Sequence, residues 1–305
     1  MTNKRPIIYV DRLSKSFGEL RAVDEISFDV SPGEVLGFLG PNGAGKSTVM
    51  RILTCLLSAD SGTATICGYS VSDRSTAMLG HIGYLPGIFQ MYENLTCEEF
   101  VQFIAHVRKT DCVDHAHELA QRIDLDLSRK TRELSKGNRQ KLGVVAAFMH
   151  EPEVLILDEP TSGLDPIVQQ EFEGMLAEAK ARGAAVLLSS HVLSEVEHLS
   201  DRVAILNAGK IVLLDDISEI KQRAMSRIEF EFSQEVPATQ FAHLPQVFSA
   251  VAKGTRVLCE VQGEYPELIQ VAADLSVVRV RTQEPSLEEI FLGLIDSDNH
   301  EKRGE

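Results

Sequence analysis

One eight-residue segment limits the folds open to this chain more than any other feature. Gly40-Pro-Asn-Gly-Ala-Gly-Lys-Ser47 fits the pattern G-x-x-x-x-G-K-[ST] without a mismatch. The apolar run Glu34–Leu39 before it is typical of a buried strand, and apolar residues recur at helical spacing from Lys46 to Leu57. A strand, a glycine-rich loop and a helix in this order predict a phosphate-binding loop in an α/β fold.

The chemistry of this loop predicts a triphosphate ligand. Glycines let successive backbone N–H groups converge on phosphate oxygens, and the helix N-terminus adds the positive end of its dipole. Lys46 is expected to reach the β- and γ-phosphates, and the Ser47 hydroxyl to coordinate Mg²⁺. An ordinary glycine-rich turn is the alternative, and the flanking strand and helix argue against it. The residues assigned to nucleotide binding from this motif are Gly40, Pro41, Asn42, Gly43, Ala44, Gly45, Lys46, Ser47 and Thr48.

Two carboxylates end another strand-like run, Leu155-Ile-Leu-Asp158-Glu159. Open α/β sheets place ligand sites at the carboxyl ends of their strands. Asp158 is therefore expected to hold the magnesium ion, directly or through water, and Glu159 to polarise the water that attacks the γ-phosphorus. A solvated pair that caps the next helix is the alternative.

A histidine follows the next strand-like run in the same way. Ser189-Ser190-His191 comes directly after Ala184–Leu188, and the helical pattern Val168–Ala181 separates that run from Val154–Leu157. Strand, helix and strand indicate a parallel sheet, so His191 is expected at the same edge as the two carboxylates. There it could hydrogen-bond the γ-phosphate and orient the attacking water; a purely structural histidine is the alternative.

The rest of the pattern predicts two domains. Residues 88–150 read mostly as helix and form a helical subdomain within a P-loop ATPase domain spanning residues 1–221. A smaller α+β domain is predicted over residues 222–295, where Arg227–Phe232 alternates cleanly, and residues 296–305 form a polar tail. The further elements expected in that domain are strands at 257–261 and 277–281 and helices at 266–273 and 286–295.

Composition excludes several classes of protein. The 305 residues carry a formal net charge of −15 and are 44% hydrophobic, which excludes a chain disordered throughout and disfavours a nucleic-acid partner. No apolar run approaches the roughly 18 residues needed to cross a bilayer. The first residues lack the pattern of a secretory signal, and the five cysteines include no CxxC pair. We therefore expect a cytoplasmic chain with reduced thiols.

Leu134-Ser-Lys-Gly137 narrows the family. By itself, Ser135 is a good cap for the helical run that follows. Together with the phosphate-binding loop and Asp158-Glu159, the segment resembles the signature of ATP-binding subunits of ABC transporters, in particular those of bacterial multidrug and antibiotic exporters. The resemblance covers about residues 7–220. Lys136 stands in place of the commoner glycine, and Asn138 in place of glutamine.

This resemblance implies roles for further residues. In the family, two subunits close head to tail, so Ser135 and Gly137 of one would contact the γ-phosphate held by Lys46 of the other. Asp165 matches the segment that links the two sites, and Phe17 matches the aromatic position that stacks on adenine.

One position departs from the family pattern. Gly87 stands where the family has a glutamine that touches Mg²⁺ and the attacking water, and Gln90 follows three residues later. Either water completes the magnesium shell, or Gln90 reaches in through an altered loop. The resemblance also makes 87–95 the candidate contact with a membrane subunit, with Met91 and Tyr92 as its apolar points. Packing inside the helical subdomain is an equal alternative for these two side chains.

The sequence thus predicts an ATP-hydrolysing subunit that binds ATP and Mg²⁺ and forms a dimer, with an identical second chain as our expectation. It would drive a separate integral membrane permease, an exporter by resemblance, from the cytoplasmic face of the inner membrane. The alternative is an ABC-type ATPase that acts on ribosomes or DNA, or a nucleotide-gated regulator. One ATPase core, no sustained heptads and the net charge of −15 disfavour it.

Overall fold

The computed structural model describes residues 5–89, 91–223 and 225–283. The chain divides into two compact units, Met1–Leu214 and Asp215–Glu305. The sequence predicted a domain boundary after residue 221. The structure divides the chain after Leu214, so helix α8, Ile217–Arg223, belongs to the second unit.

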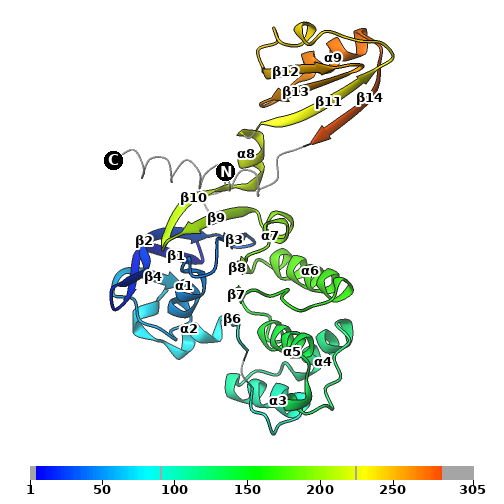
Figure 1. The fold of residues 1–305 in the computed structure, drawn as a ribbon. Helices are drawn as coiled ribbons and strands as arrows, with labels where there is room; N and C mark the ends of the chain where they lie inside the picture. The colour runs from blue at the N-terminus through cyan, green and yellow to red at the C-terminus, as the bar shows by residue number, and fades with distance from the viewer. Residues whose placement is uncertain (1–4, 90, 224, 284–305) are drawn as a thin grey trace. The chain divides into compact units, whose positions relative to one another are not determined.

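Two sheets build the first unit (Figure 1). An antiparallel sheet has the order β2-β1-β4-β5, with bounds Leu20–Val30, Ile8–Phe17, Ser61–Ile66 and Tyr69–Ser70. A six-stranded sheet has the order β10-β9-β3-β8-β7-β6, with bounds Lys210–Asp216, Arg202–Asn207, Val35–Leu39, Ala185–Ser190, Val154–Asp158 and Ile82–Leu85. Strand β3 pairs parallel with β8 and β9, and β7 pairs parallel with β8 and β6. The predicted parallel sheet is therefore present, and the carboxyl ends of β3, β7 and β8 meet at one edge.

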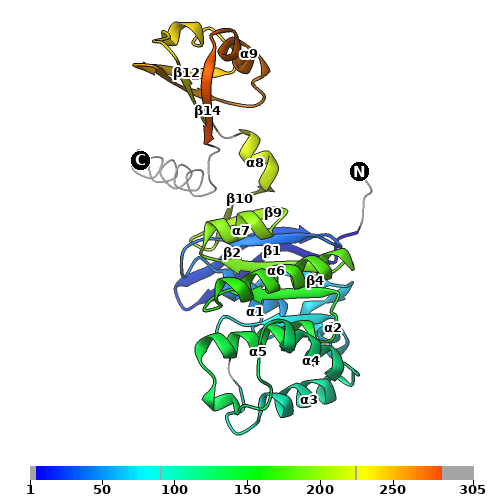
Figure 2. The same cartoon turned by 90° about the vertical axis from the view of Figure 1, so that its right-hand side faces the viewer.

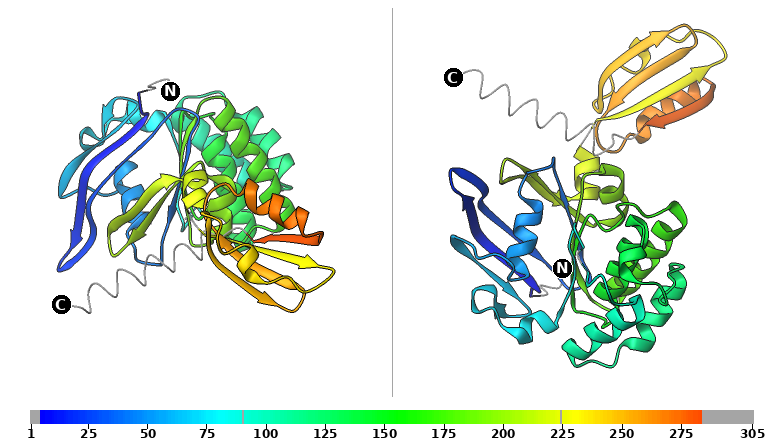
Figure 3. Two further views of the ribbon diagram at one scale, coloured as in Figure 1. Left: turned by 90° about the horizontal axis from the view of Figure 1, so that it is seen from above. Right: turned by 60° about the horizontal axis from the view of Figure 1, so that its bottom comes forward.

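Seven α-helices accompany these sheets within the described part of the first unit. They are α1 (Lys46–Leu53), α2 (Thr76–Gly80), α3 (Cys97–Arg108), α4 (Val113–Arg122), α5 (Lys136–Phe148), α6 (Pro166–Ala181) and α7 (Leu193–Leu199), with 3₁₀ turns at Val71–Asp73 and Thr131–Glu133. Helix α1 lies between the two sheets, whereas α5, α6 and α7 lie on the other side of the six-stranded sheet (Figures 1 and 3). Helices α3, α4 and α5 group together within the segment that the sequence predicted to be helical (Figure 2).

Apolar side chains from both sheets and α1 share one core. Phe28 of β2 meets Phe38 of β3 edge to face, with ring centroids 5.0 Å apart. On the far side of the six-stranded sheet, Phe148 of α5 packs in the same manner on Phe172 of α6, at 6.0 Å. A sheet covered on both faces needs apolar residues at every strand position, which is why β3 and β7 read as continuous apolar runs.

Side chains at the helix starts satisfy backbone N–H groups that the helices leave free. Thr96 and Glu99 form a reciprocal capping box at α3. Ser135 caps α5 through the N–H of Asn138, and Asp165 caps α6. These caps fix where the loops of the parallel sheet turn into helices.

The helix after the glycine-rich loop is shorter than predicted. It ends at Leu53 rather than Leu57, because Cys55 adopts a left-handed backbone conformation, with φ of 60°. The N–H groups of Leu56 and Leu57 both bond the carbonyl of Arg51, which closes the helix end. Leu57 still packs against the core from this turn, so its apolar periodicity has a tertiary cause.

The second unit is an antiparallel sheet with a helix on one face. The sheet has the order β12-β13-β11-β14, with bounds Val247–Lys253, Arg256–Val261, Ser226–Phe232 and Val277–Gln283, and α9 spans Pro266–Asp274. Phe230 stacks on Phe241 in its core, with centroids 5.5 Å apart. The predicted strands and the helix at 266–273 are found. Strand β12 was missed because most of its residues are exposed or half-exposed and do not alternate. The predicted helix at 286–295 and the tail lie outside the described residues.

Leu53, the last residue of α1, and Leu56, three residues beyond it, test this packing with the same chemical change. Leu53→Ala removes a fully buried side chain and is expected to lower the free energy of unfolding by about 2–5 kcal/mol. Leu56→Ala removes a side chain that is 62% exposed and should change it by no more than about 0.5 kcal/mol. Urea unfolding of both variants measures the difference. Equal losses would contradict the placement of the helix end.

Candidate active site

The glycine-rich loop joins β3 to α1 in a backbone conformation that only glycine adopts readily. Gly45, the residue before α1, has φ of 108° and provides no side-chain cap. A Cβ atom there would lie 2.4 Å from the carbonyl oxygen of Ala22. The first N–H groups of α1 thus have no side-chain acceptor from the cap, so phosphate oxygens could accept their hydrogen bonds.

Lys46 places a buried positive charge inside this loop. Its side chain is 6% exposed, and its Nζ donates to the carbonyl oxygens of Gly40 at 2.5 Å and Pro41 at 3.2 Å. Burial lowers the pKa of Lys46, and the negative charges of Glu159 and Asp158 oppose that shift. The ammonium group is therefore held in place by the loop and electrostatically coupled to the two carboxylates.

Asp158 ends β7 as a buried carboxylate, 4% exposed. The neighbouring strand β8 places Ser189 directly beside it, and the Ser189 hydroxyl donates to Asp158 Oδ1 at 2.6 Å. The backbone N–H of Glu159 donates to the same hydroxyl at 3.1 Å. Asp158 is therefore not solvated, and the next helix is capped by Asp165 instead. Both facts argue against the alternative in which Asp158 is a solvated helix cap.

Glu159 and His191 form a hydrogen-bonded pair at the same edge. Glu159 turns away from β7 with φ of 54°, and its Oε2 lies 2.6 Å from His191 Nδ1. The Glu159 side chain is 22% exposed and that of His191 is 58% exposed. His191 thus emerges beside the carboxylates, as its position after β8 predicted. A carboxylate oriented by an imidazole can accept a proton from water.

Most of the predicted nucleotide-binding residues line one groove. Phe17, at the end of β1, forms part of its wall with a ring that is 48% exposed, and Lys15 Nζ lies 5.7 Å from the ring centroid. The lining residues are Phe17, Leu20, Ala22, Asn42, Gly43, Ala44, Gly45, Lys46, Ser47, Thr48, Arg51, Gly87, Ile88, Asp158 and Glu159. Gly40 and Pro41 join this site through Lys46, and His191 joins it through Glu159.

Gly87 lies against Asp158 at the end of β6. A Cβ atom at Gly87 would lie 3.1 Å from Asp158 Oδ2. The position where a glutamine was expected therefore does face the carboxylate, but it supplies no side chain. Gln90, the other residue considered for this role, lies outside the described residues.

The signature segment lies apart from this groove. Ser135 is exposed, and its hydroxyl accepts from the N–H of Asn138 at 3.2 Å. Gly137 packs closely on the loop before α6, where a Cβ atom would lie 2.7 Å from the carbonyl oxygen of Gly163. Among the described residues, the lining of the groove includes neither of these two nor Asp165, whose carboxylate bonds the N–H groups of Ile167 and Val168.

Two polar residues that sequence reasoning missed connect these parts. Gln140 of α5 is buried, and its Nε2 donates to the carbonyl oxygens of Glu159 at 3.0 Å and Pro160 at 2.9 Å. Glu195 of α7 accepts from Thr161 at 2.8 Å and Ser190 at 2.7 Å, so it joins the loop after β7 to the end of β8. Gln140 lies between Arg139 and Lys141 in the polar first half of α5, so nothing in the sequence distinguishes it as a buried donor.

Known proteins resemble this chain in sequence and in fold. The model of the ABC transporter family matches residues 23–162. The chain is 33% identical to YdbJ of Bacillus subtilis (strain 168), an uncharacterized ABC transporter ATP-binding protein, over 98% of both chains. It is 32% identical to the bacitracin transport ATP-binding protein BcrA of Bacillus licheniformis, over 95% of this chain and 97% of that one. Among solved structures, an ATP-binding subunit of an ABC transporter matches with a TM-score of 0.67 and 31% identity, over 71% of this chain and 92% of that one.

Two glycines of the loop test its geometry without nucleotide. Gly43 has φ of 83° and open space around its Cβ position, so Gly43→Ala should lower the free energy of unfolding by about 1–2 kcal/mol. Gly45→Ala adds the contact with Ala22 to similar strain and should cost roughly 1–3 kcal/mol more. Thermal or urea unfolding of the nucleotide-free variants measures both. A Gly45→Ala variant as stable as Gly43→Ala would overturn the described loop conformation.

Proposed function

Because this chain belongs to the ABC transporter ATP-binding proteins, we propose that its groove binds and hydrolyses MgATP to drive a separate membrane permease. One observation carries the proposal: buried Lys46 lies in a glycine-rich loop that shares a groove with Asp158 and Glu159. A triphosphate needs a positive charge and backbone N–H groups, and hydrolysis needs a base beside them.

The loop is built to exchange its internal contacts for phosphate. Lys46 Nζ bonds two loop carbonyls, and a bound triphosphate offers stronger, charged acceptors at the same place. The N–H groups at the start of α1 add to this cradle. Phe17, half-exposed at the wall of the groove, presents a flat ring on which adenine can stack.

The residues present suit a magnesium ion. Mg²⁺ prefers oxygen ligands and keeps several of its waters, and the Ser47 hydroxyl and Asp158 carboxylate are both in the groove. The hydrogen bond from Ser189 fixes the orientation of Asp158. Gly87 offers no side chain there, so we propose that water completes the shell. When bound, the ion would neutralise charge on the phosphates.

Hydrolysis can use the pair Glu159 and His191. Glu159 would accept a proton from the attacking water, whose oxygen bonds the γ-phosphorus as the bond to the β-phosphate oxygen breaks, leaving ADP and inorganic phosphate. His191 Nδ1 lies 2.6 Å from Glu159 Oε2. In the imidazolium form both ring nitrogens are donors, so Nε2–H could then donate to a phosphate oxygen. The hydrogen bond from Gln140 Nε2 to the carbonyl oxygen of Glu159 fixes the backbone of Glu159.

We propose that two identical chains close over two nucleotides. Ser135 is exposed at the start of α5, so its hydroxyl and the helix N-terminus are accessible to a second chain. Bound ATP would attract both Lys46 of one chain and Ser135 of the other, so it favours the closed pair by differential affinity. Gln140 and the packing of Gly137 on Gly163 would connect this closure to Glu159 within each chain.

The loop after β6 is our candidate for the permease contact. Ile88 is 74% exposed and Tyr92 is 62% exposed, although the Tyr92 ring also packs on Phe103 of α3, with centroids 5.5 Å apart. The Tyr92 side chain thus packs on α3 on one side and stays mostly exposed on the other, where it could contact a permease. A groove beside this loop is lined by Ile88, Phe89, Met91, Glu93, Thr131, Arg132 and Arg139.

Transport needs a partner that crosses the membrane. None of the helices in the described residues is long and apolar enough to do so. We therefore propose that the chain acts at the cytoplasmic face of the inner membrane, bound to integral permease subunits. The relative BcrA, a bacitracin transport ATP-binding protein, supports transport of an antibiotic or similar compound, and we propose that the direction is export. The ribosome or DNA alternative is not favoured, because the transporter relatives match both units of the chain.

Glu159→Gln tests the catalytic assignment. It keeps the size of the side chain but removes the base, so steady-state phosphate release should fall by a factor of about 10² to 10⁴ while ATP binding persists. The variant should also accumulate as an ATP-bound dimer in size-exclusion chromatography. Lys46→Ala is the comparison: it should weaken binding of a fluorescent ATP analogue itself. Undiminished phosphate release by Glu159→Gln would remove Glu159 from this role.

Ser135→Asp tests whether the signature acts across the dimer. Aspartate caps a helix as well as serine does, so α5 stays intact while a negative charge faces the γ-phosphate. Chains with Ser135→Asp and chains with Lys46→Ala should each be inactive alone. Mixed together, they should recover ATP hydrolysis, because a mixed pair has one intact composite site.

Ser135→Asn is the matched control, since it keeps the cap and removes the hydroxyl without adding a charge, so it should lose less activity than Ser135→Asp. If the mixture stays inactive although mixed pairs form, the signature does not act in trans.

A further inference from the structure

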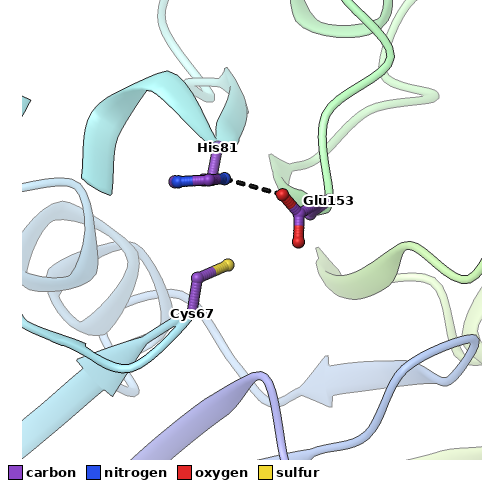
Figure 4. A group of neighbouring side chains, drawn as sticks. All are labelled: Cys67, His81 and Glu153. Carbon is purple, nitrogen blue, oxygen red and sulfur yellow. Dashed lines mark hydrogen bonds and ion pairs between the residues drawn. The ribbon is translucent and has the colours of Figure 1, made fainter. Parts of the chain in front are cut away.

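A cysteine, a histidine and a glutamate from three separate segments converge in the first unit (Figure 4). The ligand atoms of Cys67, His81 and Glu153 all lie within 4.8 Å of one another. His81 Nδ1 and Glu153 Oε1 are 2.7 Å apart. Among the described residues, this is the one group of three such side chains this close together. The proposed ATPase cycle uses none of them.

The backbone holds each of the three in place. Cys67 sits in the tight turn between β4 and β5 with φ of 51°, and its N–H donates to the carbonyl of Ile7 at 2.9 Å. The carbonyl of His81 accepts from the N–H of Val154 at 3.0 Å, which places His81 beside Glu153. The ring of Tyr69 stacks on that of His81, with centroids 5.7 Å apart. Cys67 and His81 therefore lie in turns whose backbones are bonded to neighbouring segments, and Glu153 directly precedes the paired strand β7, which helps to preorganise the cluster.

The donor set selects among possible roles. A catalytic thiol needs a lowered pKa, whereas burial, together with the nearby charge of Glu153, raises the pKa of Cys67 to about 11. Sulfur, imidazole nitrogen and carboxylate oxygen are together the ligands that Zn²⁺ takes in proteins, and a strongly thiophilic cation can displace the thiol proton.

We propose that Cys67, His81 and Glu153 form a binding site for a zinc-like transition-metal cation, with a fourth position left for water. Tetrahedral Zn²⁺ with bonds of about 2.0–2.3 Å separates its ligand atoms by roughly 3–4 Å, so the side chains need only small shifts. Glu153 and His81 are partly exposed, which leaves a path for the ion to enter. Mg²⁺, which prefers oxygen ligands, is excluded by the donor set.

This site lies at the amino ends of the sheet strands, whereas the nucleotide groove lies at their carboxyl ends. His81 precedes β6 and Glu153 precedes β7, whereas Gly87 follows the carboxyl end of β6 and Asp158 is the last residue of β7. A strand of five residues is about 16 Å long. A cation there would link the antiparallel sheet, through Cys67, to the starts of strands β6 and β7 in the six-stranded sheet. It would not touch the nucleotide.

Cobalt binding tests the site in the full chain without nucleotide. Co²⁺ takes the same ligands and gives a sulfur-to-cobalt absorption band, so titration with excess Mg²⁺ present should show this band saturating at one Co²⁺ per chain. Cys67→Ser should abolish the band. Glu153→Gln, a change at an exposed carboxyl group, should weaken Co²⁺ binding about tenfold or more.

Cys55→Ser is the matched control, because Cys55 is another half-buried thiol of the same unit and its Sγ bonds the carbonyl of Val71 instead. It should keep the band and the affinity. Zn²⁺ should also raise the melting temperature of the wild type but not of Cys67→Ser.

Absence of the band in the wild type, its survival in Cys67→Ser, or unchanged affinity in Glu153→Gln would each overturn the proposal. ATP binding measured in the same samples should be normal in all these variants, so a failure here leaves the ATPase assignment intact.

Discussion

The structure depends on one arrangement of charge: a buried lysine held opposite two carboxylates at the edge of a parallel sheet. Lys46 follows β3, Asp158 ends β7 and Glu159 comes directly after it, so parallel pairing through β8 brings oppositely charged groups together. Such a lysine loses solvation, and the pKa of its side chain falls accordingly. A triphosphate with its magnesium ion fits between these charges, because it supplies anionic oxygens to Lys46 and a cation to Asp158.

The groove alone is half of a working site under this account. Ser135 caps α5 and Gly137 lies in its first turn, and the lining of the described groove includes neither residue. Gln140 of the same helix nevertheless donates to the carbonyl oxygens of Glu159 and Pro160. A second chain that presses on the start of α5 would therefore act on the backbone of Glu159, the proposed base. Helix α5 would then have two proposed roles, one across the dimer and one within its own chain.

The sequence predicted the parallel sheet, the loop and the edge where Asp158, Glu159 and His191 gather, because each of these is encoded by adjacent residues. It overextended α1 to Leu57, since the periodicity of Leu56 and Leu57 does not reveal the left-handed turn at Cys55. Gln140 and Glu195 were missed, and the hydrogen bond from Ser189 to Asp158 was not predicted, because these side chains bond partners that are distant in sequence. The cluster of Cys67, His81 and Glu153 was equally invisible, since no local spacing relates these residues.

A crystal structure with a non-hydrolysable ATP analogue and Mg²⁺ tests the central claim most directly. The account predicts the γ-phosphate between Lys46 and the start of α1 in one chain, with Ser135 of a second chain on its other side. It also predicts Ser47 and Asp158 at the magnesium ion, with only water on the side of Gly87. An analogue bound elsewhere, or sealed in the groove by residues of the same chain alone, would contradict it.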